Sequence, residues 1–494
     1  MPDSRLAPVV AALHGAGLLT RLIGVLPEAV TGIADDSRLV TAGALFIAVR
    51  GSAHDGHDYV AAAQAAGAAV AIVEEADATT LPRLVVREGR RAASLAAAAY
   101  YGAPARSLSL VGVTGTSGKT TVVSMLRHLL DGPTTPAASI GTLGVLAGSA
   151  GLARVGGAGL TTPGPIELQR VLRELVDSGV RRVAMEVSSH ALDQRRVDGV
   201  SFDAAVFTNL TRDHLDYHGS MEGYLAAKAR LIDHLSSAGT AVVNDDVETW
   251  RALPPAPHTV RYGMSSRTAE VRALDVTFSP DGSRWTLVTP DARGEVHLPL
   301  IGDFNVMNAL GAAAAAWSIG SPTATVAERL STLPQVPGRL ERILDVPAVL
   351  RDYAHKPDAL DRALLAVRPF TAGRLIVVFG CGGDRDRGKR PIMGEIAERR
   401  ADVVILTSDN PRTEDPERIL DEIEAGMQRP HERIEDRRLA IARALSLAVA
   451  GDVIVLAGKG HETYQIRGTR SSPFDERAIV QALARELRLD RGEP

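Results

Sequence analysis

The sequence predicts an α/β protein with three domains: a small first domain, a central parallel-sheet domain of the P-loop type, and a C-terminal Rossmann-like domain. Three observations support this fold class: the length of 494 residues, the repeated alternation of short apolar runs with helical patterns, and a glycine-rich turn between a strand and a helix. A chain of this length is too long for one compact core. Its 45% hydrophobic and 23% charged residues are typical of globular domains.

Residues 1–107 form the first predicted domain, a small α/β unit. Apolar runs that indicate strands cover 45–49, 68–73 and 84–86, and Ala-rich helical patterns cover 60–66 and 91–101. The run Gly102-Ala103-Pro104 contains two residues that interrupt regular structure, so it marks the end of this domain.

The second predicted domain covers residues 108–337 and centres on a parallel sheet. A strand over 108–113 leads into a glycine-rich turn and then a helix from about Gly118. Further strands are predicted at 182–187, 204–207 and 240–243, helices at 166–178, 221–235 and 305–319, and β alternation over 271–298. Strands that alternate with helices indicate parallel pairing under helical cover. The Pro- and Gly-containing run 334–338 is the second linker.

The third predicted domain, residues 338–494, repeats the alternation. Strands are predicted at 348–352, 375–379, 403–407 and 453–456, and helices at 357–367, 392–399 and 416–427. This order is typical of a doubly wound, Rossmann-like sheet. We therefore expect ligands at the carboxyl ends of its strands.

The composition and charge of the chain argue against several classes of function. Lys+Arg is 55 against Asp+Glu 59, a net charge of −4, which argues against a general binder of nucleic acid or anionic membranes. No apolar run reaches the roughly 18 residues of a membrane span, and the first residues lack a signal-peptide pattern. The one cysteine, Cys381, excludes an internal disulfide and fits a reducing compartment. We expect a cytoplasmic protein.

The turn after the strand at 108–113 has the residue types of a phosphate-binding loop. It consists of Thr114, Gly115, Thr116, Ser117, Gly118, Lys119 and Thr120. Glycines let backbone N–H groups close around phosphate oxygens, and the helix N-terminus adds positive potential. Lys119 would reach the β- and γ-phosphates of ATP or GTP, and Thr120 would offer its hydroxyl to Mg²⁺. The gap between the glycines is shorter than in the usual Walker pattern.

Acidic and imidazole side chains follow the next two strands of the central domain. They are Glu186 and His190 after one strand, and Asp213, His214, Asp216 and His218 after the other. Because the carboxyl ends of parallel strands share one edge, this pattern predicts a metal–phosphate site. Zinc binding by the second group is a weaker alternative, since no cysteine takes part and phosphate chemistry prefers oxygen-bound Mg²⁺.

Lysine is rare in this chain. Among 55 basic residues only five are lysines, namely Lys119, Lys228, Lys356, Lys389 and Lys459. Genomic base composition explains such a bias, but lysine can lose its proton and arginine cannot, so each lysine merits attention. Lys228 stands among alanines in the helical pattern 221–235, and the pattern alone slightly favours a solvated side chain.

Six motifs of the chain resemble those of the Mur ligases, a family of ATP-dependent amino-acid ligases of peptidoglycan synthesis. The motifs are residues 114–120, 186–190, 208–219, 352–358, 380–386 and 457–462. The resemblance covers essentially the whole chain in the three-domain order of the family. It implies addition of meso-2,6-diaminopimelate to UDP-N-acetylmuramoyl-L-alanyl-D-glutamate through an acyl phosphate. The expected partners are small-molecule substrates only, and the expected state is a monomer.

The resemblance also implies catalytic and metal-binding residues. Thr120 and Glu186 would hold one Mg²⁺ between the ATP phosphates, and Glu186, His214 and a carbamylated Lys228 would hold a second. Lys119, Glu186, His214 and Lys228 would be the catalytic residues. This implication opposes the solvated interpretation of Lys228, because a neutral amine can add CO₂ and become an anionic carbamate.

Further binding residues follow from the same resemblance. Asn308, Arg339 and Asp352 would contact ATP together with the residues of the loop 114–120. The uridine nucleotide and its muramoyl dipeptide would contact Ser37, Ser52, Ala53, His54, Thr161, Thr162, Ser188, Gln194 and Arg196. The chain departs from the family at Ser117 and Lys356, where Asn and Thr are common, and both substitutes are polar.

The turn of Asp409, Asn410, Pro411 and Arg412 resembles the family's version that selects meso-diaminopimelate. This amino acid carries a second carboxylate that lysine lacks, and arginine offers bidentate recognition of it. Without that carboxylate a buried guanidinium would be left unpaired, which discriminates against lysine. Arg385, Gly458 and Glu462 match the other contacts to this substrate, with Glu462 binding the distal ammonium. The alternative for Arg412 is an arginine at a helix start that faces solvent.

Three alternatives stay open at this point. Two are related ligases, a lysine-adding relative and a folylpolyglutamate synthase, and the long matches at 380–386 and 409–412 weigh against both. The third, from another class, is a P-loop ATPase or regulatory module without ligation. It predicts nucleotide turnover that is independent of any amino acid.

Overall fold

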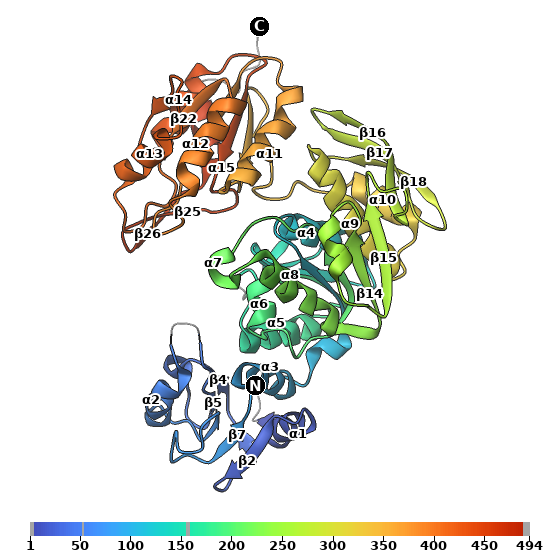
Figure 1. The fold of residues 1–494 in the computed structure, drawn as a ribbon, viewed down its shortest axis with the longest axis vertical. Coiled ribbons are helices and arrows are strands. Elements are labelled where there is room, and N and C mark those ends of the chain that lie inside the picture. Colours follow the sequence, from blue (N-terminus) through green and yellow to red (C-terminus); the bar gives the residue numbers. More distant parts are fainter. Residues whose placement is uncertain (1–3, 52–53, 155–158, 488–494) are drawn as a thin grey trace. The chain divides into compact units, whose positions relative to one another are not determined.

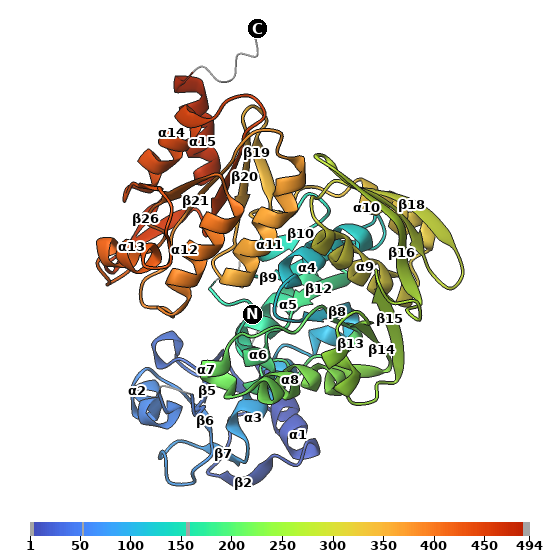
Figure 2. The ribbon, with the colours of Figure 1, turned by 45° about the horizontal axis from the view of Figure 1, so that its top comes forward.

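The computed structural model describes residues 4–51, 54–154 and 159–487 (Figures 1 and 2). The chain divides into two compact units. The first comprises residues 1–274, 286–295 and 307–330, and the second comprises 275–285, 296–306 and 331–494. In the described part, no helix has the length and apolar character that crossing a membrane requires.

The N-terminal part of the first unit is a five-stranded sheet with helices on both faces. The strand order is β2 (Leu19–Ile23), β7 (Arg83–Val86), β6 (Val70–Val73), β5 (Leu45–Ile47) and β4 (Ile33–Ala34), parallel except for β2. Leu45 and Ile47 pack with α1 (Ala7–Gly15) and α3 (Gly89–Tyr100), whereas Phe46 packs with α2 (Val60–Ala65). Both faces are covered, which explains why the inner strands β5 and β6 are continuous apolar runs. A small sheet of β1 (Ser4–Arg5) and β3 (Ala29–Val30) completes this part.

The central sheet has eleven strands and carries the phosphate-loop motif. Its order is β11 (Leu152–Arg154), β10 (Gly144–Ala147), β9 (Ala137–Gly141), β12 (Arg182–Glu186), β8 (Ser109–Thr114), β13 (Phe202–Phe207), β14 (Leu235–Asn244), β15 (His258–Gly263), β16 (Val271–Ser279), β17 (Gly282–Val288) and β18 (Arg293–Leu298). The pairs from β9 to β16 are parallel. The predicted β alternation over 271–298 corresponds to β16, β17 and β18. The carboxyl ends of β8, β12 and β13 therefore lie at one edge.

Helices of the central part follow these strands. They are α4 (Lys119–Leu130), α5 (Pro165–Asp177), α6 (Ser189–Asp193), α7 (Leu215–His218), α8 (Met221–Ala229), α9 (Asp303–Ser318) and α10 (Thr323–Ser331). The helix predicted over 221–235 ends earlier, at Ala229, and continues as a 3₁₀ helix over Arg230–His234. Leu231 and Ile232 stay buried in the core through this tighter turn.

The C-terminal sheet in the second unit has six strands. Its order is β19 (Glu341–Leu344), β20 (Ala348–Asp352), β24 (Val453–Ala457), β21 (Leu375–Phe379), β22 (Val403–Leu406) and β23 (Glu432–Arg433), parallel except for β19. Val377 and Phe379 face a core with α11 (Pro357–Val367), α12 (Lys389–Arg400) and α13 (Pro416–Glu424). Ile376 and Val378 face α14 (Arg437–Leu447) and α15 (Glu476–Glu486). Figure 2 shows these helices on the two sides of the sheet.

The observed architecture is the predicted α/β class with parallel-dominated sheets. Among the elements near the C-terminus that were not predicted are α14, α15, and a hairpin of β25 (Tyr464–Arg467) and β26 (Arg470–Pro473). The hairpin is short and carries polar residues on both strands, so its sequence lacks a clear apolar alternation. The hairpin contacts the turn that contains Arg412, since Arg467 of β25 forms an isolated bridge with Arg412.

Candidate active site

The glycine-rich loop lies between β8 and α4, and both of its glycines are required. Gly115 has φ +145° and Gly118 has φ +86°, values that favour glycine. A Cβ on Gly115 would lie 1.9 Å from Thr208 Oγ1, and one on Gly118 would lie 2.4 Å from Asn308 Oδ1. The structure therefore brings Asn308, on α9, directly against the loop.

Residues after β13 brace the same loop. The N–H groups of Thr116 and Ser117 donate to Asn209 O and Asn209 Oδ1, both at 2.9 Å. Thr208 Oγ1 donates to Ser117 O at 2.7 Å. The sequence placed Thr208 and Asn209 inside a family motif but assigned them no role, and the structure shows that they support the loop.

Two lysines converge on one carbonyl oxygen of the loop. Lys119 Nζ donates to Gly115 O at 2.8 Å and to Thr116 O at 3.0 Å. Lys228 Nζ, from α8, donates to the same Gly115 O at 2.8 Å and lies 4.4 Å from the ring centre of Tyr224. Lys228 is only 1% exposed, so the solvated interpretation from the helix pattern is wrong. The amino groups of two lysines therefore share one acceptor at the base of the loop.

Glu186 ends β12, on the strand next to the one that leads into the loop. It pairs with Val113 in the parallel ladder of β12 and β8, so its backbone lies beside the last residues of β8. Glu186 is 1% exposed, and its Oε1 accepts a hydrogen bond from the Thr142 N–H at 2.8 Å. A Cβ on Gly141 would lie 2.3 Å from Glu186 Oε1. Glycine at 141 therefore leaves room for a buried carboxylate.

His214 lies at the start of α7 with φ +52°. Its Nε2 is 3.3 Å from Asp213 Oδ2, and its ring centre is 4.8 Å from that of His190. Burial lowers the pKa of His190 and of His218, so both imidazoles are predominantly neutral at pH 7. Among the described residues no group of three or more His, Cys, Asp and Glu side chains is arranged to hold a metal ion. This finding gives the zinc alternative no support.

Four residues predicted to contact the muramoyl dipeptide form one hydrogen-bonded network. Thr162 Oγ1 accepts from the Ser188 N–H at 3.0 Å and donates to Glu186 O at 2.9 Å. Arg196 donates to Thr162 O at 3.0 Å and to Gln194 Oε1 at 2.6 Å. The network joins the end of β12 to α6 and the turn after it, next to the buried carboxylate.

The other residues predicted for this substrate lie in two places. Thr161 Oγ1 is 3.4 Å from Thr142 Oγ1, so it lies beside the Glu186 site. Ser37 begins a 3₁₀ helix in the N-terminal sheet region, and the His54 ring lies 6.4 Å from the Tyr59 ring in an edge-to-face arrangement. Ser52 and Ala53 fall outside the described residues.

The predicted residues of the second unit follow parallel strands and share one edge of its sheet. Asp352 ends β20, residues 380–386 follow β21, residues 407–412 follow β22, and Gly458 follows β24. Asp352 pairs with Ala457, and the Gly458 N–H donates to Asp352 O at 3.0 Å. Ligands bind at this edge in doubly wound sheets.

The predicted ATP-contacting residues of this edge are held by the linker. Asp352 Oδ2 accepts from the Leu340 N–H at 2.7 Å, and the Arg339 guanidinium lies 4.8 Å from the Tyr353 ring centre. Burial raises the pKa of Asp352, and Arg339 partly offsets this rise. Burial lowers the pKa of nearby His461 to about 4, so this imidazole is neutral at pH 7.

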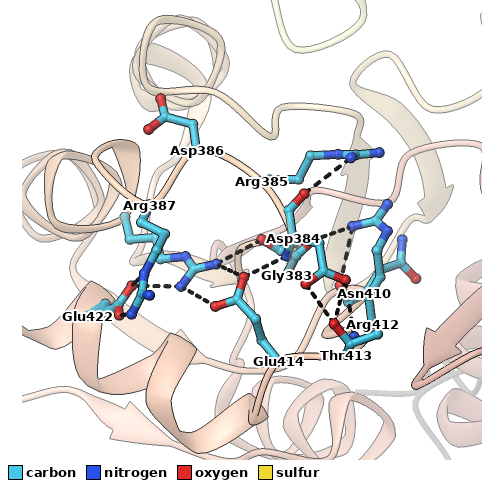
Figure 3. Close-up of polar contacts among 12 residues, drawn as sticks. Gly383, Asp384, Arg385, Asp386, Arg387, Asn410, Arg412, Thr413, Glu414 and Glu422 are labelled. Carbon is cyan, nitrogen blue, oxygen red and sulfur yellow. Dashed lines mark hydrogen bonds and ion pairs between the residues drawn. The ribbon is translucent and has the colours of Figure 1, made fainter. Parts of the chain in front are cut away.

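The Asp409–Arg412 turn is pinned by the unpredicted hairpin. Arg412 has φ +51°, its N–H donates to Ile466 O at 3.1 Å, and its carbonyl accepts from the Gly468 N–H at 2.6 Å. The side chain is half-buried, and its Nη1 donates to Gly383 O at 2.9 Å. The solvent-facing alternative for Arg412 is therefore wrong. α13 begins only at Pro416, and the guanidinium turns back onto the neighbouring loop (Figure 3).

Glycines let the loop after β21 approach this turn. A Cβ on Gly383 would lie 1.9 Å from Pro411 O, so the two backbones are in direct contact. A Cβ on Gly382 would lie 3.0 Å from Arg412 Nη1 and 3.8 Å from Arg385 Cγ. The Arg412 guanidinium and the stem of Arg385, both predicted to bind diaminopimelate, therefore lie beside Gly382, where the absence of a side chain leaves room. Figure 3 shows the two arginines on the neighbouring loops.

An ion-pair network under these loops was missed by sequence reasoning. Arg390, on α12, is fully buried and donates to Glu414 Oε2 at 3.0 Å, Glu422 Oε2 at 2.6 Å and Gly382 O at 3.3 Å. Glu414 Oε1 also accepts from the Asp384 N–H at 2.5 Å. One guanidinium thus ties both substrate loops to α12 and α13, which the spacing of these residues did not reveal.

Comparisons with known proteins agree with this geometry. Family models described as the Mur ligase catalytic domain, the Mur ligase middle domain and the Mur ligase glutamate ligase domain match residues 29–106, 113–316 and 338–460. A curated protein of Geobacter metallireducens named UDP-N-acetylmuramoyl-L-alanyl-D-glutamate–2,6-diaminopimelate ligase is 45% identical, over 94% of this chain and 96% of its own length. A protein of Synechococcus elongatus with the same name is 46% identical, over 92% and 93%.

A solved structure of a protein with that name is also similar. It is 33% identical, covers 94% of this chain and 98% of its own, and superposes with a TM-score of 0.68. The family models together match most of the chain, and the two curated relatives cover nearly all of it. The chain therefore belongs to the Mur ligase family.

Proposed function

We propose that this protein is an ATP-dependent ligase that adds meso-2,6-diaminopimelate to UDP-N-acetylmuramoyl-L-alanyl-D-glutamate. The names of the relatives at 45% and 46% identity support this activity. The observation that carries the amino-acid specificity is Arg412, held with φ +51° by the hairpin and placed with Arg385 over Gly382. The Arg412 guanidinium, with the Arg385 side chain beside the same glycine, fits a substrate that has a carboxylate at its far end.

The loop between β8 and α4 would bind the ATP phosphates through its backbone N–H groups and Lys119. The donor set around it fits Mg²⁺, because Gly141 leaves room for the buried carboxylate of Glu186 and Thr120 adds a hydroxyl. Thr120 and Glu186 would hold one ion, and Glu186, His214 and carbamylated Lys228 a second. Bound Mg²⁺ neutralises phosphate charge during phosphoryl transfer.

Carbamylation of Lys228 fits its surroundings. Its Nζ shares Gly115 O with Lys119 Nζ and is almost fully buried, so a neutral amine avoids repulsion between two ammonium groups. A neutral amine can add CO₂. The N–C bond forms with loss of one proton to solvent, and the carbamate would carry negative charge beside Lys119 and offer oxygen ligands to a metal ion.

The chemistry we propose has two steps. The γ-carboxylate of the substrate's D-glutamate attacks the γ-phosphate of ATP, which gives an acyl phosphate and releases ADP. The free amine of diaminopimelate then attacks the acyl carbon, and phosphate leaves. Lys119 holds the phosphates, the network around Thr162 and Arg196 orients the dipeptide, and Glu462 and Arg412 orient the amino acid.

We further propose a division of labour along the chain. Residues 1–107 bind the uridine nucleotide, residues 108–337 bind ATP, and residues 338–494 bind the amino acid. The enzyme acts as a monomer in the cytoplasm and brings the three substrates together by motion at the linkers near residues 104 and 337.

One assay tests the activity. Phosphate release is measured with ATP, Mg²⁺ and the uridine-linked dipeptide, with diaminopimelate, L-lysine or no amino acid. We expect release with diaminopimelate only. Equal turnover with lysine contradicts the role of Arg412, and turnover without any amino acid favours a plain ATPase.

A further inference from the structure

Lys459 follows β24 and is completely buried at the carboxyl edge of the C-terminal sheet. Its Nζ donates to Asn410 Oδ1 at 3.0 Å and to Tyr464 O at 2.8 Å. The same nitrogen lies 3.4 Å from Asp409 Oδ1 and 3.8 Å from Glu462 Oε2. Burying a charge is costly unless it is paired and hydrogen-bonded, so a lysine kept in this position needs the surrounding acceptors.

The contacts of Asn410 fix the orientation of its amide. Its Oδ1 accepts from Lys459 Nζ and from the Ile466 N–H, both at 3.0 Å, and its Nδ2 donates to Glu462 Oε2 at 2.9 Å. An ammonium and a backbone N–H can only donate, and a carboxylate can only accept. If the amide were flipped, its NH₂ group would face the donors of Lys459 and Ile466, and its oxygen would face the Glu462 carboxylate. Lys459 therefore helps to determine which group of Asn410 faces Glu462.

Glu462 depends on this arrangement for its charge. Burial raises the pKa of the Glu462 carboxyl, and Asn410 and Lys459 counteract this rise. Asn410 occupies Oε2, and the carboxylate has a second oxygen, Oε1, with which to accept from an ammonium group. Without Lys459, a half-buried carboxylate beside Asp409 would lose its nearest positive charge.

We propose that Lys459 is a positioning residue for amino-acid selection. It fixes the Asn410 amide and holds Glu462 as an anion for the ammonium group at the far end of a diamino acid. This inference rests on the proposed function. Lys459 is buried behind Asn410 and acts through that residue and Glu462, without touching the substrate.

The test uses the full-length chain with Lys459→Met, at saturating ATP and uridine-linked dipeptide. We expect the KM for diaminopimelate to rise about tenfold to 150-fold, the range for loss of hydrogen bonds to charged groups. The kcat and the KM for ATP stay near wild type. An unchanged KM for diaminopimelate, or a loss confined to kcat, overturns the proposal.

Arg374→Met is the matched control. Arg374 pairs with the buried Asp452 at 2.8 Å, at the opposite ends of β21 and β24 from the site. The substitution, like Lys459→Met, removes a cation from a buried carboxylate. We therefore expect Arg374→Met to lower the stability of the protein but to leave the KM for diaminopimelate unchanged. If both variants raise this KM equally, the effect is a general loss of structure and the proposal fails.

A double variant separates positioning from packing. Glu462→Gln removes the group through which Lys459 acts, so Lys459→Met in that background raises the KM much less than it does in the wild type. The same fold-change in both backgrounds contradicts the proposal. If Lys459→Met does not fold, Lys459→Gln replaces it. Its amide still donates to Asn410 but carries no charge, so we expect a smaller rise, and no rise counts against the proposal.

The wild-type assay keeps this inference distinct from the proposed function. If diaminopimelate does not support turnover by the wild type, the proposed function fails. Lys459 is then judged from a crystal structure of Lys459→Met, in which we expect the contact between Asn410 Nδ2 and Glu462 to be lost. An unchanged contact overturns the positioning role whichever amino acid the enzyme uses.

Discussion

Gly382→Ala is a sharp probe of how the two arginines recognise their substrate. Gly382 does not have a positive φ, so its backbone accepts alanine. The added Cβ would lie 3.0 Å from Arg412 Nη1, closer than ordinary van der Waals contact, and that atom is the end of a flexible side chain. The guanidinium must therefore move, and its 2.9 Å hydrogen bond to Gly383 O is lost or lengthened. The substitution should change the stability of the fold little, because the added Cβ crowds no backbone atom.

The magnitude follows from the bonds at risk. A hydrogen bond to a charged group contributes about 1.5–3 kcal/mol, which corresponds to roughly a tenfold to 150-fold rise in the KM for diaminopimelate. Steady-state phosphate release at varied diaminopimelate measures this change, and thermal unfolding should give a midpoint within a few degrees of wild type. Gly388→Ala is the control, since its Cβ would meet only Asp386 Oδ1, at 3.2 Å. An unchanged KM for Gly382→Ala would refute the placement of Arg412.

Three further predictions concern the other parts of the site. Lys228→Arg keeps a positive charge but cannot form a carbamate, so we expect a folded enzyme that has lost most of its activity. With ¹³CO₂, we expect the wild type to show a ¹³C carbamate signal and the variant to show none. Normal turnover by the variant would exclude the carbamate. Gly141→Ala places a Cβ 2.3 Å from the buried Oε1 of Glu186, so the carboxylate must move. Because a displacement of about 1 Å can reduce a rate about a hundredfold, we expect kcat to fall by about that factor. An unchanged kcat would show that Glu186 takes no part in the reaction. Burial lowers the pKa of His461 to about 4 in the folded state, against about 6.5 when unfolded. Between these values the unfolded chain binds more protons, so the free energy of unfolding falls as pH drops, by up to about 1.4 kcal/mol per pH unit for this group. His461→Gln should reduce this dependence in denaturation experiments at pH 4.5 and 7, and an identical slope would contradict the assignment.

The sequence was informative wherever local pattern and chemistry coincide. The strand at 108–113, the glycines and Lys119 fall in register, so the loop between β8 and α4 was predictable from spacing. The rule that ligands gather at carboxyl ends of parallel strands similarly anticipated that Asp352, Asp409 and Gly458 share one edge. In both cases the prediction depends on short-range order along the chain, which a single sequence contains.

Contacts between distant segments were beyond such reasoning. Lys228 looks like a solvated helix residue among alanines, and only the packing of α8 against the loop reveals that its Nζ meets Gly115 O across 113 positions of sequence. In the sequence nothing distinguishes Arg390 from the many other arginines, yet its side chain is fully buried and pairs with Glu414 and Glu422. The hairpin that pins Arg412 has no strong periodicity. Each of these features is defined by its partner, and nothing local identifies the partner.

The contacts of the lysines bear on why lysine is retained at a few positions. Lys119 and Lys228 donate to Gly115 O and Lys389 to His355 O, in site loops, and Lys459 donates to Tyr464 O at the start of β25. An ammonium is a compact charge on a slim stem, whereas a guanidinium is a wide planar fork. Arginines also donate to main-chain carbonyls of the site loops, as Arg412 does to Gly383 O, so a carbonyl acceptor alone does not select lysine. Gly115 O differs because two side chains meet at one oxygen, where two slim amines crowd each other less than two planar guanidinium groups would. Base composition can account for arginine elsewhere in the chain, and crowding at Gly115 O is the physical reason for lysine at positions 119 and 228.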